Sequence, residues 1–228
     1  METLAEIPFE LSAEALMRQV RVQPGTDDAQ EFQALLDAAR RVARPKALYR
    51  ECFIQAKGDR TVTLEGITFT SRVLRRHLDE AERVFPFIAT CGHEMDGVAL
   101  PAGDLLKGFW WDVVKSALLG FAVEHLGRHL ARRFALGKTA VMSPGEGDVS
   151  MWPIEQQKEL FTLLGDVKGQ IGVELTDSLL MIPNKTRSGI LFPTERDFHS
   201  CQLCPRQDCP ARRTSFDRRL WESMQLRS

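Results

Sequence analysis

Three cysteines and one histidine lie close together near the C-terminal end of the chain: His199, Cys201, Cys204 and Cys209. Two cysteines separated by two residues can turn their sulfurs toward one ion, and three thiolates with a fourth ligand hold tetrahedral zinc or a [4Fe–4S] cluster. The spacing therefore predicts a metal site, zinc or iron–sulfur, with unligated surface thiols as the alternative. The candidates for the fourth ligand are His199, Cys52, Cys91 and an exogenous group.

Two histidines four residues apart form a second group, because His125 and His129 share one face of a predicted helix with Glu124 beside them. Zinc proteases place the acid between the two histidines, whereas Glu124 precedes the pair, so we expect both histidines at the edge of the core. Cys52 and Cys91 fall in predicted strands, and we expect them to be structural.

A loop rich in glycine and proline, residues 143–147, reads Ser-Pro-Gly-Glu-Gly. Proline and glycine favour a rigid turn that exposes backbone amides and carbonyls to a bound ligand. The alternative is an ordinary connection between two elements.

Composition limits the function classes. The chain has 228 residues, with 30 Lys and Arg against 31 Asp and Glu and a net charge of −1, which argues against a dedicated nucleic-acid binder. The first residues, METLAEIPFELS, lack the positive charge and apolar core of a signal peptide, and no apolar run is long enough to span a membrane. We expect a cytoplasmic protein that needs no disulfides to fold.

Hydrophobic periodicity predicts helices mixed irregularly with strands, which is typical of an α+β fold. The predicted helices are 26–42, capped by Asp27, and 71–82, 104–134 and 154–164. The predicted strands are 48–56, 61–69, 84–92 and a region 171–192 that Pro183 and Gly189 interrupt. We divide the chain into an N-terminal helical segment 1–44, an α+β domain 45–196 and a Cys- and Arg-rich tail 197–228.

The second half of the α+β domain resembles the activation domain of cobalamin-dependent methionine synthase. The resemblance is specific over 105–192, only topological over 45–104, and absent before residue 45. It rests on Ser143-Pro144-Gly145, Gly147-Asp148, the helix Gln157–Leu164, and the series Leu175-Thr176-Asp177-Ser178, Met181, Pro183, Thr186, Ser188-Gly189 and Phe192.

The resemblance implies a twisted antiparallel sheet flanked by helices. It also implies a protein that binds S-adenosylmethionine and docks on a corrinoid partner or methionine synthase. There, one electron from a donor protein and the sulfonium methyl group together restore methylcobalamin from cob(II)alamin. The residues expected to line the ligand groove are Pro144, Gly145, Glu146, the turn Ser188-Gly189, and Glu124 for the ligand's amine.

Two family positions differ in this chain. Val141 stands where the family has an arginine for the ligand's carboxylate, and Glu146 where it has a tyrosine. Losing a charge-assisted contact costs about 1.5–3 kcal/mol, so we expect a weaker or altered ligand site. The cysteine tail is expected to hold a cluster that passes the electron. The alternative function is a non-catalytic scaffold for a corrinoid partner, with a decayed ligand site and a structural zinc.

Overall fold

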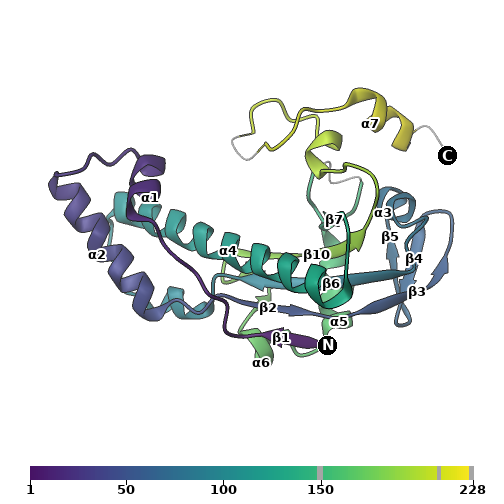
Figure 1. Cartoon of the computed structure of the whole chain (residues 1–228), viewed down its shortest axis with the longest axis horizontal. Coiled ribbons are helices and arrows are strands. Elements are labelled where there is room, and N and C mark those ends of the chain that lie inside the picture. The colour runs from purple at the N-terminus through teal and green to yellow at the C-terminus, as the bar shows by residue number, and fades with distance from the viewer. Residues whose placement is uncertain (148–150, 210–211, 226–228) are drawn as a thin grey trace.

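The computed structural model describes residues 1–147, 151–209 and 212–225. It has an antiparallel sheet flanked by helices (Figure 1), so the predicted α+β class is confirmed.

The strands are β1 Glu2–Leu4, β2 Lys46–Tyr49, β3 Cys52–Lys57, β4 Thr61–Leu64, β5 Ile67–Thr70, β6 Arg83–Thr90, β7 Thr139–Met142, β8 Glu174–Leu175, β9 Met181–Ile182 and β10 Thr186–Pro193. The α-helices are α1 Ala13–Val20, α2 Asp27–Val42, α3 Arg72–His77, α4 Leu105–Phe134, α5 Gln157–Leu164, α6 Val167–Ile171 and α7 Arg218–Gln225. Short 3₁₀ helices are η1 His93–Gly97, η2 Ile154–Gln156 and η3 Ser200–Leu203.

The central strand is β6, which pairs with β10 along one edge and with β2 and then β3 along the other. Alternate side chains of β6 point to opposite faces of the sheet. Phe85 and Phe87 pack with Leu126 of α4, whereas Ile88 packs in a second cluster with Leu160 of α5. Because helices cover both faces, seven of its eight residues are buried.

The predicted strand 48–56 is interrupted in the structure, although β2 and β3 keep one register along β6. Tyr49 pairs with Phe87 and Cys52 with Val84. Between these pairs the Arg50 N–H donates to the Pro86 carbonyl at 3.0 Å. Proline has no N–H to return this bond, so the ladder breaks opposite Pro86.

The helix predicted at 71–82 is shorter than expected and ends at His77. The Lys57 ammonium donates to the carbonyls of Asp79 and Ala81, at 2.7 and 2.8 Å. These hydrogen bonds satisfy the Asp79 and Ala81 carbonyls, which lie in the connection between α3 and β6 and not in the helix.

The N-terminal helices α1 and α2 lie beside the first turns of α4 (Figure 1). Phe32 of α2 meets Trp110 of α4 edge to face, with ring centroids 5.5 Å apart. The predicted cap of α2 was wrong by one residue, since the Thr26 side chain, and not that of Asp27, accepts from the Ala29 N–H. Thr26 extends in the β region, the conformation that an N-cap residue adopts.

The C-terminal tail packs against the central domain through apolar side chains. Leu203 and Met224 are buried in the cluster that contains Ile88. The Phe198 ring lies 3.7 Å from the His77 ring, centroid to centroid. Since β1 also joins the sheet by pairing with β2, both outer segments contact the central one. The boundaries 1–44, 45–196 and 197–228 stay a prediction.

Within the described ranges, no helix is both long and apolar enough to cross a membrane.

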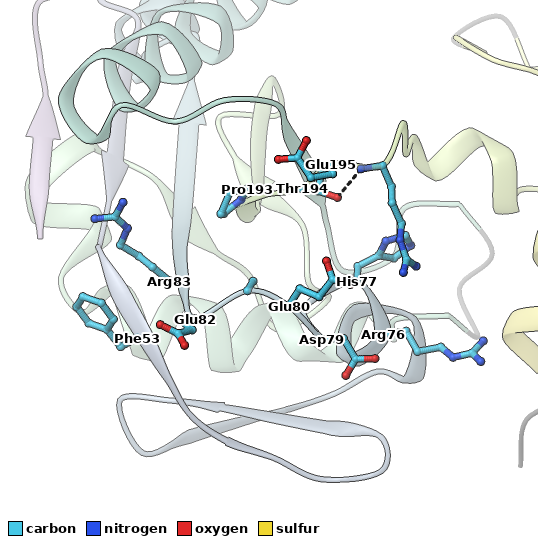
Figure 2. A pocket seen from close by; sticks show the side chains of 12 residues that line it. Phe53, Arg76, His77, Asp79, Glu80, Glu82, Arg83, Pro193, Thr194 and Glu195 are labelled. Carbon is cyan, nitrogen blue, oxygen red and sulfur yellow. Dashed lines mark hydrogen bonds between the residues drawn. The ribbon is translucent and has the colours of Figure 1, made fainter.

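A cavity of about 500 Å³ opens beside His77. Figure 2 shows its lining side chains, which come from the segment 76–83, from Phe53 of β3, and from Pro193 at the end of β10 with the three residues after it. The His77 Nε2 is buried and has no hydrogen-bond partner in the described part of the chain. Burial, and then the cations of Arg196 and Arg76, lower the pKa of His77 from 6.5 to about 4.

The lowered pKa of His77 predicts a loss of stability in mild acid. Below pH 6.5 the unfolded chain protonates this ring while the folded chain does not. Stability is therefore lost as the pH falls from 6.5 to about 4, by up to about 3 kcal/mol. Urea unfolding measures this loss across that window, and His77→Phe keeps a ring while removing the titration, so it should reduce the loss. His93→Gln, at an exposed histidine, is the control. Equal losses in the wild type and His77→Phe would contradict the account.

Candidate functional site

The loop that follows β7 is held as a tight turn by backbone hydrogen bonds. The Gly145 N–H donates to the Trp152 carbonyl at 2.8 Å, and the Glu146 N–H donates to the Ser143 carbonyl at 3.2 Å. Trp152 is only 1% exposed, so the loop is anchored to the core. Gly145 and Gly147 have φ angles of 76° and 84°, in the left-handed region that favours glycine. Pro144, inside this turn, is buried.

Ser188 and Gly189 lie inside β10, so the expected turn at these residues was wrong, and Gly189 does not interrupt the strand. A Cβ atom at Gly189 would lie 2.6 Å from the Met142 carbonyl oxygen and 2.9 Å from the Ser143 Oγ. The missing side chain therefore lets the end of β7 lie against β10. This close approach brings the start of the loop 143–147 next to Gly189, while the ligand groove expected there stays a prediction.

Arg187, the residue before this pair, reaches across to the loop. Its Nη2 lies 3.1 and 3.3 Å from the two carboxylate oxygens of Glu146. Both side chains are partly exposed, at 22% and 32%. The sequence alone did not single out Arg187, because an arginine at the start of a strand is usually solvated. Its position directly before Ser188-Gly189 was the available signal.

The cysteine tail contacts the same loop. A Cβ at Gly147 would lie 3.3 Å from the Ser200 carbonyl oxygen. Burial lowers the pKa of His199; the cations of Arg213 and Arg187 add to the shift, and the Glu146 carboxylate opposes it. Charged side chains of the tail, the loop and β10 therefore all act on His199. Asp148, which belongs to the family pattern, lies outside the described residues.

The predicted metal ligands are near one another in sequence but do not form a ligand set in space. No group of three or more His, Cys, Asp or Glu side chains in the described ranges is arranged to hold a metal. The His199 Nδ1 accepts from the Cys201 N–H at 3.2 Å. The Arg212 guanidinium donates to the carbonyls of Cys201 and Cys204, at 3.3 and 3.2 Å, and so holds the cysteine loop together. As arranged here, these side chains do not fit a metal or cluster. The metal site expected from the spacing of His199, Cys201, Cys204 and Cys209 is therefore not shown and stays a prediction.

Glu124 lies on an exposed turn of α4 and pairs with Arg128 on the same helix, at 3.2 Å. In the described part of the chain no hydrogen bond or ion pair joins Glu124 to the loop 143–147. Its assignment to the ligand's amine stays a prediction.

Cys52 and Cys91 are fully buried, as expected for structural cysteines. Burial raises the pKa of Cys52 to about 11 and that of Cys91 to about 12, so neither thiol ionises near neutral pH. His129 lies at the edge of the core, with its Nε2 3.0 Å from the Tyr49 hydroxyl.

The contact of Gly189 with the end of β7 predicts that Gly189→Ala destabilises the fold. The added methyl group meets backbone atoms that cannot move aside, which typically costs about 1–3 kcal/mol. Gly120→Ala is the matched control, because a Cβ there meets nothing within 4 Å on the exposed face of α4. Alanine at a helix interior should stabilise by about 0.5–1 kcal/mol. Denaturant unfolding compares the two, and a Gly189→Ala protein as stable as the wild type would contradict the close approach.

Searches of protein-family models and of curated proteins find no match for this chain.

A solved structure of the MetH reactivation domain bound to AdoHcy has a similar fold. The two share 14% sequence identity with a TM-score of 0.56, over 89% of this chain and 81% of the other. At this identity the likeness establishes the fold, an antiparallel sheet flanked by helices of the reactivation-domain type.

Proposed function

We propose that this chain is an activation-domain-like protein that binds S-adenosylmethionine where the loop 143–147 meets β10. The observation that carries the proposal is the Glu146–Arg187 ion pair, which joins the residue after Pro144-Gly145 to the residue before Ser188-Gly189. The fold is similar to that of a reactivation domain whose structure holds AdoHcy, which supports the assignment of the ligand class.

The ion pair offers both charges that an amino-acid ligand needs. The methionine part of S-adenosylmethionine carries a carboxylate and an ammonium group on one carbon. Arg187 can donate two parallel hydrogen bonds to the carboxylate, and Glu146 can accept from the ammonium. In this way Arg187 takes over the role of the family arginine that Val141 replaces.

Ligand binding must first separate Glu146 from Arg187. Both side chains reach solvent, and partly exposed ion pairs contribute only about 0–1 kcal/mol, so the cost is small. Gly145 and Gly147, with φ angles of 76° and 84°, keep the loop in the tight turn that places Glu146 opposite Arg187. Binding is expected to be weaker than in a site that keeps a free arginine, because the ligand competes with Glu146.

In this proposal the chain docks on a corrinoid partner or methionine synthase, and another protein supplies the electron. The protein's own residues hold and orient the sulfonium methyl group, and the reactive cobalt belongs to the partner. The cysteine tail has no assigned step. The second candidate is a non-catalytic corrinoid-partner scaffold with a decayed ligand site, in which Val141 and Glu146 replace the family's arginine and tyrosine.

Titration calorimetry with S-adenosylmethionine distinguishes the two candidates. We expect saturable binding in the wild type, and Arg187→Gln should weaken it about tenfold or more because one charge-assisted contact is lost. Arg83→Gln is the matched control, since Arg83 is also a half-buried strand arginine paired with a glutamate, Glu51 at 3.2 Å. Circular dichroism checks that both variants fold.

No binding to the wild type at millimolar ligand would favour the scaffold. Equal binding by the wild type and Arg187→Gln would place the ligand elsewhere.

A further inference from the structure

A basic cavity of about 560 Å³ lies along the second half of α4. Its lining residues are Pro8, His125, Arg128, His129, Arg132 and Arg133. The cavity lies near β1, because the Nε2 of its lining residue His129 is 3.3 Å from the Glu2 carboxylate of that strand. The strands β1 and β7 are at opposite edges of this part of the sheet, so the cavity is separate from the loop 143–147.

The cavity has an excess of positive charge. It is lined by three arginines and two histidines, without a carboxylate. Two nearby acids neutralise part of this charge: Glu2 lies 3.3 Å from Arg133, and Glu124 lies 3.2 Å from Arg128. Arg132 has no ion-pair or hydrogen-bond partner among the described residues. One arginine is therefore available to an anion.

His125 lies in the same field. It also has no hydrogen-bond partner in the described ranges, and it shares a helix face with Arg128 and Arg132. Burial, then the charge of Arg128 and further cations along the helix, lower the pKa of His125. The negative charge of a bound anion would offset the positive charge of these cations around His125.

The opposite wall is fixed by the core. Ile7, next to Pro8, is 5% exposed and packs in one cluster with Leu126 and Leu130 of α4. The chain segment beside Pro8 is therefore held against the helix, and the concavity between them does not depend on a free terminus. Its volume lies within the range of small-ligand pockets.

We propose that this cavity binds a small anion with several negative charges, of the phosphate-ester or diphosphate class. Arginine guanidinium groups recognise phosphate oxygens through paired N–H donors, so Arg132 would bind one anionic group of the ligand. Arg128 lies one turn away on the same helix face, and its exposed pair with Glu124 contributes only about 0–1 kcal/mol, so it is the second donor to a ligand with more than one anionic group. This site is independent of the proposed function at Arg187.

Calorimetric titration of the full chain with pyrophosphate tests the proposal, at about 50 mM salt to limit screening. We expect saturable binding in the wild type and an affinity about tenfold or more lower in Arg132→Gln. Arg18→Gln is the control, because Arg18 is an exposed helix arginine paired only with Glu14 on its own helix. It should leave the affinity unchanged.

The ring resonances of His125 in NMR spectra give a second readout, and pyrophosphate should shift them in the wild type. No saturable binding up to about 10 mM pyrophosphate would overturn the proposal, because that limit excludes even millimolar affinity. Binding that Arg132→Gln leaves unchanged, or that leaves the His125 resonances in place, would also overturn it.

Discussion

The arrangement of the candidate site depends on the close contact between β10 and the end of β7. At Gly189 the two backbones lie nearer than any side chain allows, with the Met142 carbonyl oxygen 2.6 Å from the place of a Cβ. On its other edge β10 pairs with β6, the buried central strand. The loop 143–147 is therefore fixed to the buried centre of the sheet, and Arg187 lies within reach of Glu146. The tail enters the same region, where the Ser200 carbonyl meets Gly147.

Local signals in the sequence predicted the strongly periodic elements well. The helix 104–134 differs from α4 by one residue at its start, and Asp104 caps it by accepting from the Lys107 N–H. The strand 48–56 was harder to predict, because its interruption depends on Pro86 in another strand. The turn expected at Ser188-Gly189 was wrong for a similar reason: glycine is needed there for contact with Met142 and not for a bend.

The candidate site was predictable in part. The resemblance to a known family implied that Pro144, Gly145 and Ser188-Gly189 line one ligand groove. The structure places the start of the loop, Ser143, against Gly189, and the groove itself stays a prediction. The sequence did not identify Arg187, because its partner Glu146 is 41 residues away along the chain. The packing of the tail was also beyond local patterns, because it depends on the contact between Phe198 and His77 and on the burial of Leu203. For the cysteines, spacing predicted a metal, whereas Arg212 occupies the centre of that loop through carbonyl contacts.

The central claim is that the loop 143–147 and the start of β10 form one ligand site. Hydrogen–deuterium exchange of the full chain with and without S-adenosylhomocysteine tests this claim most directly, because it reports backbone protection by segment. The account predicts slower exchange at residues 143–147 and 187–189 when the ligand is present, with little change along α1 and α2. Protection confined to other segments, or unchanged exchange at saturating ligand, would contradict it.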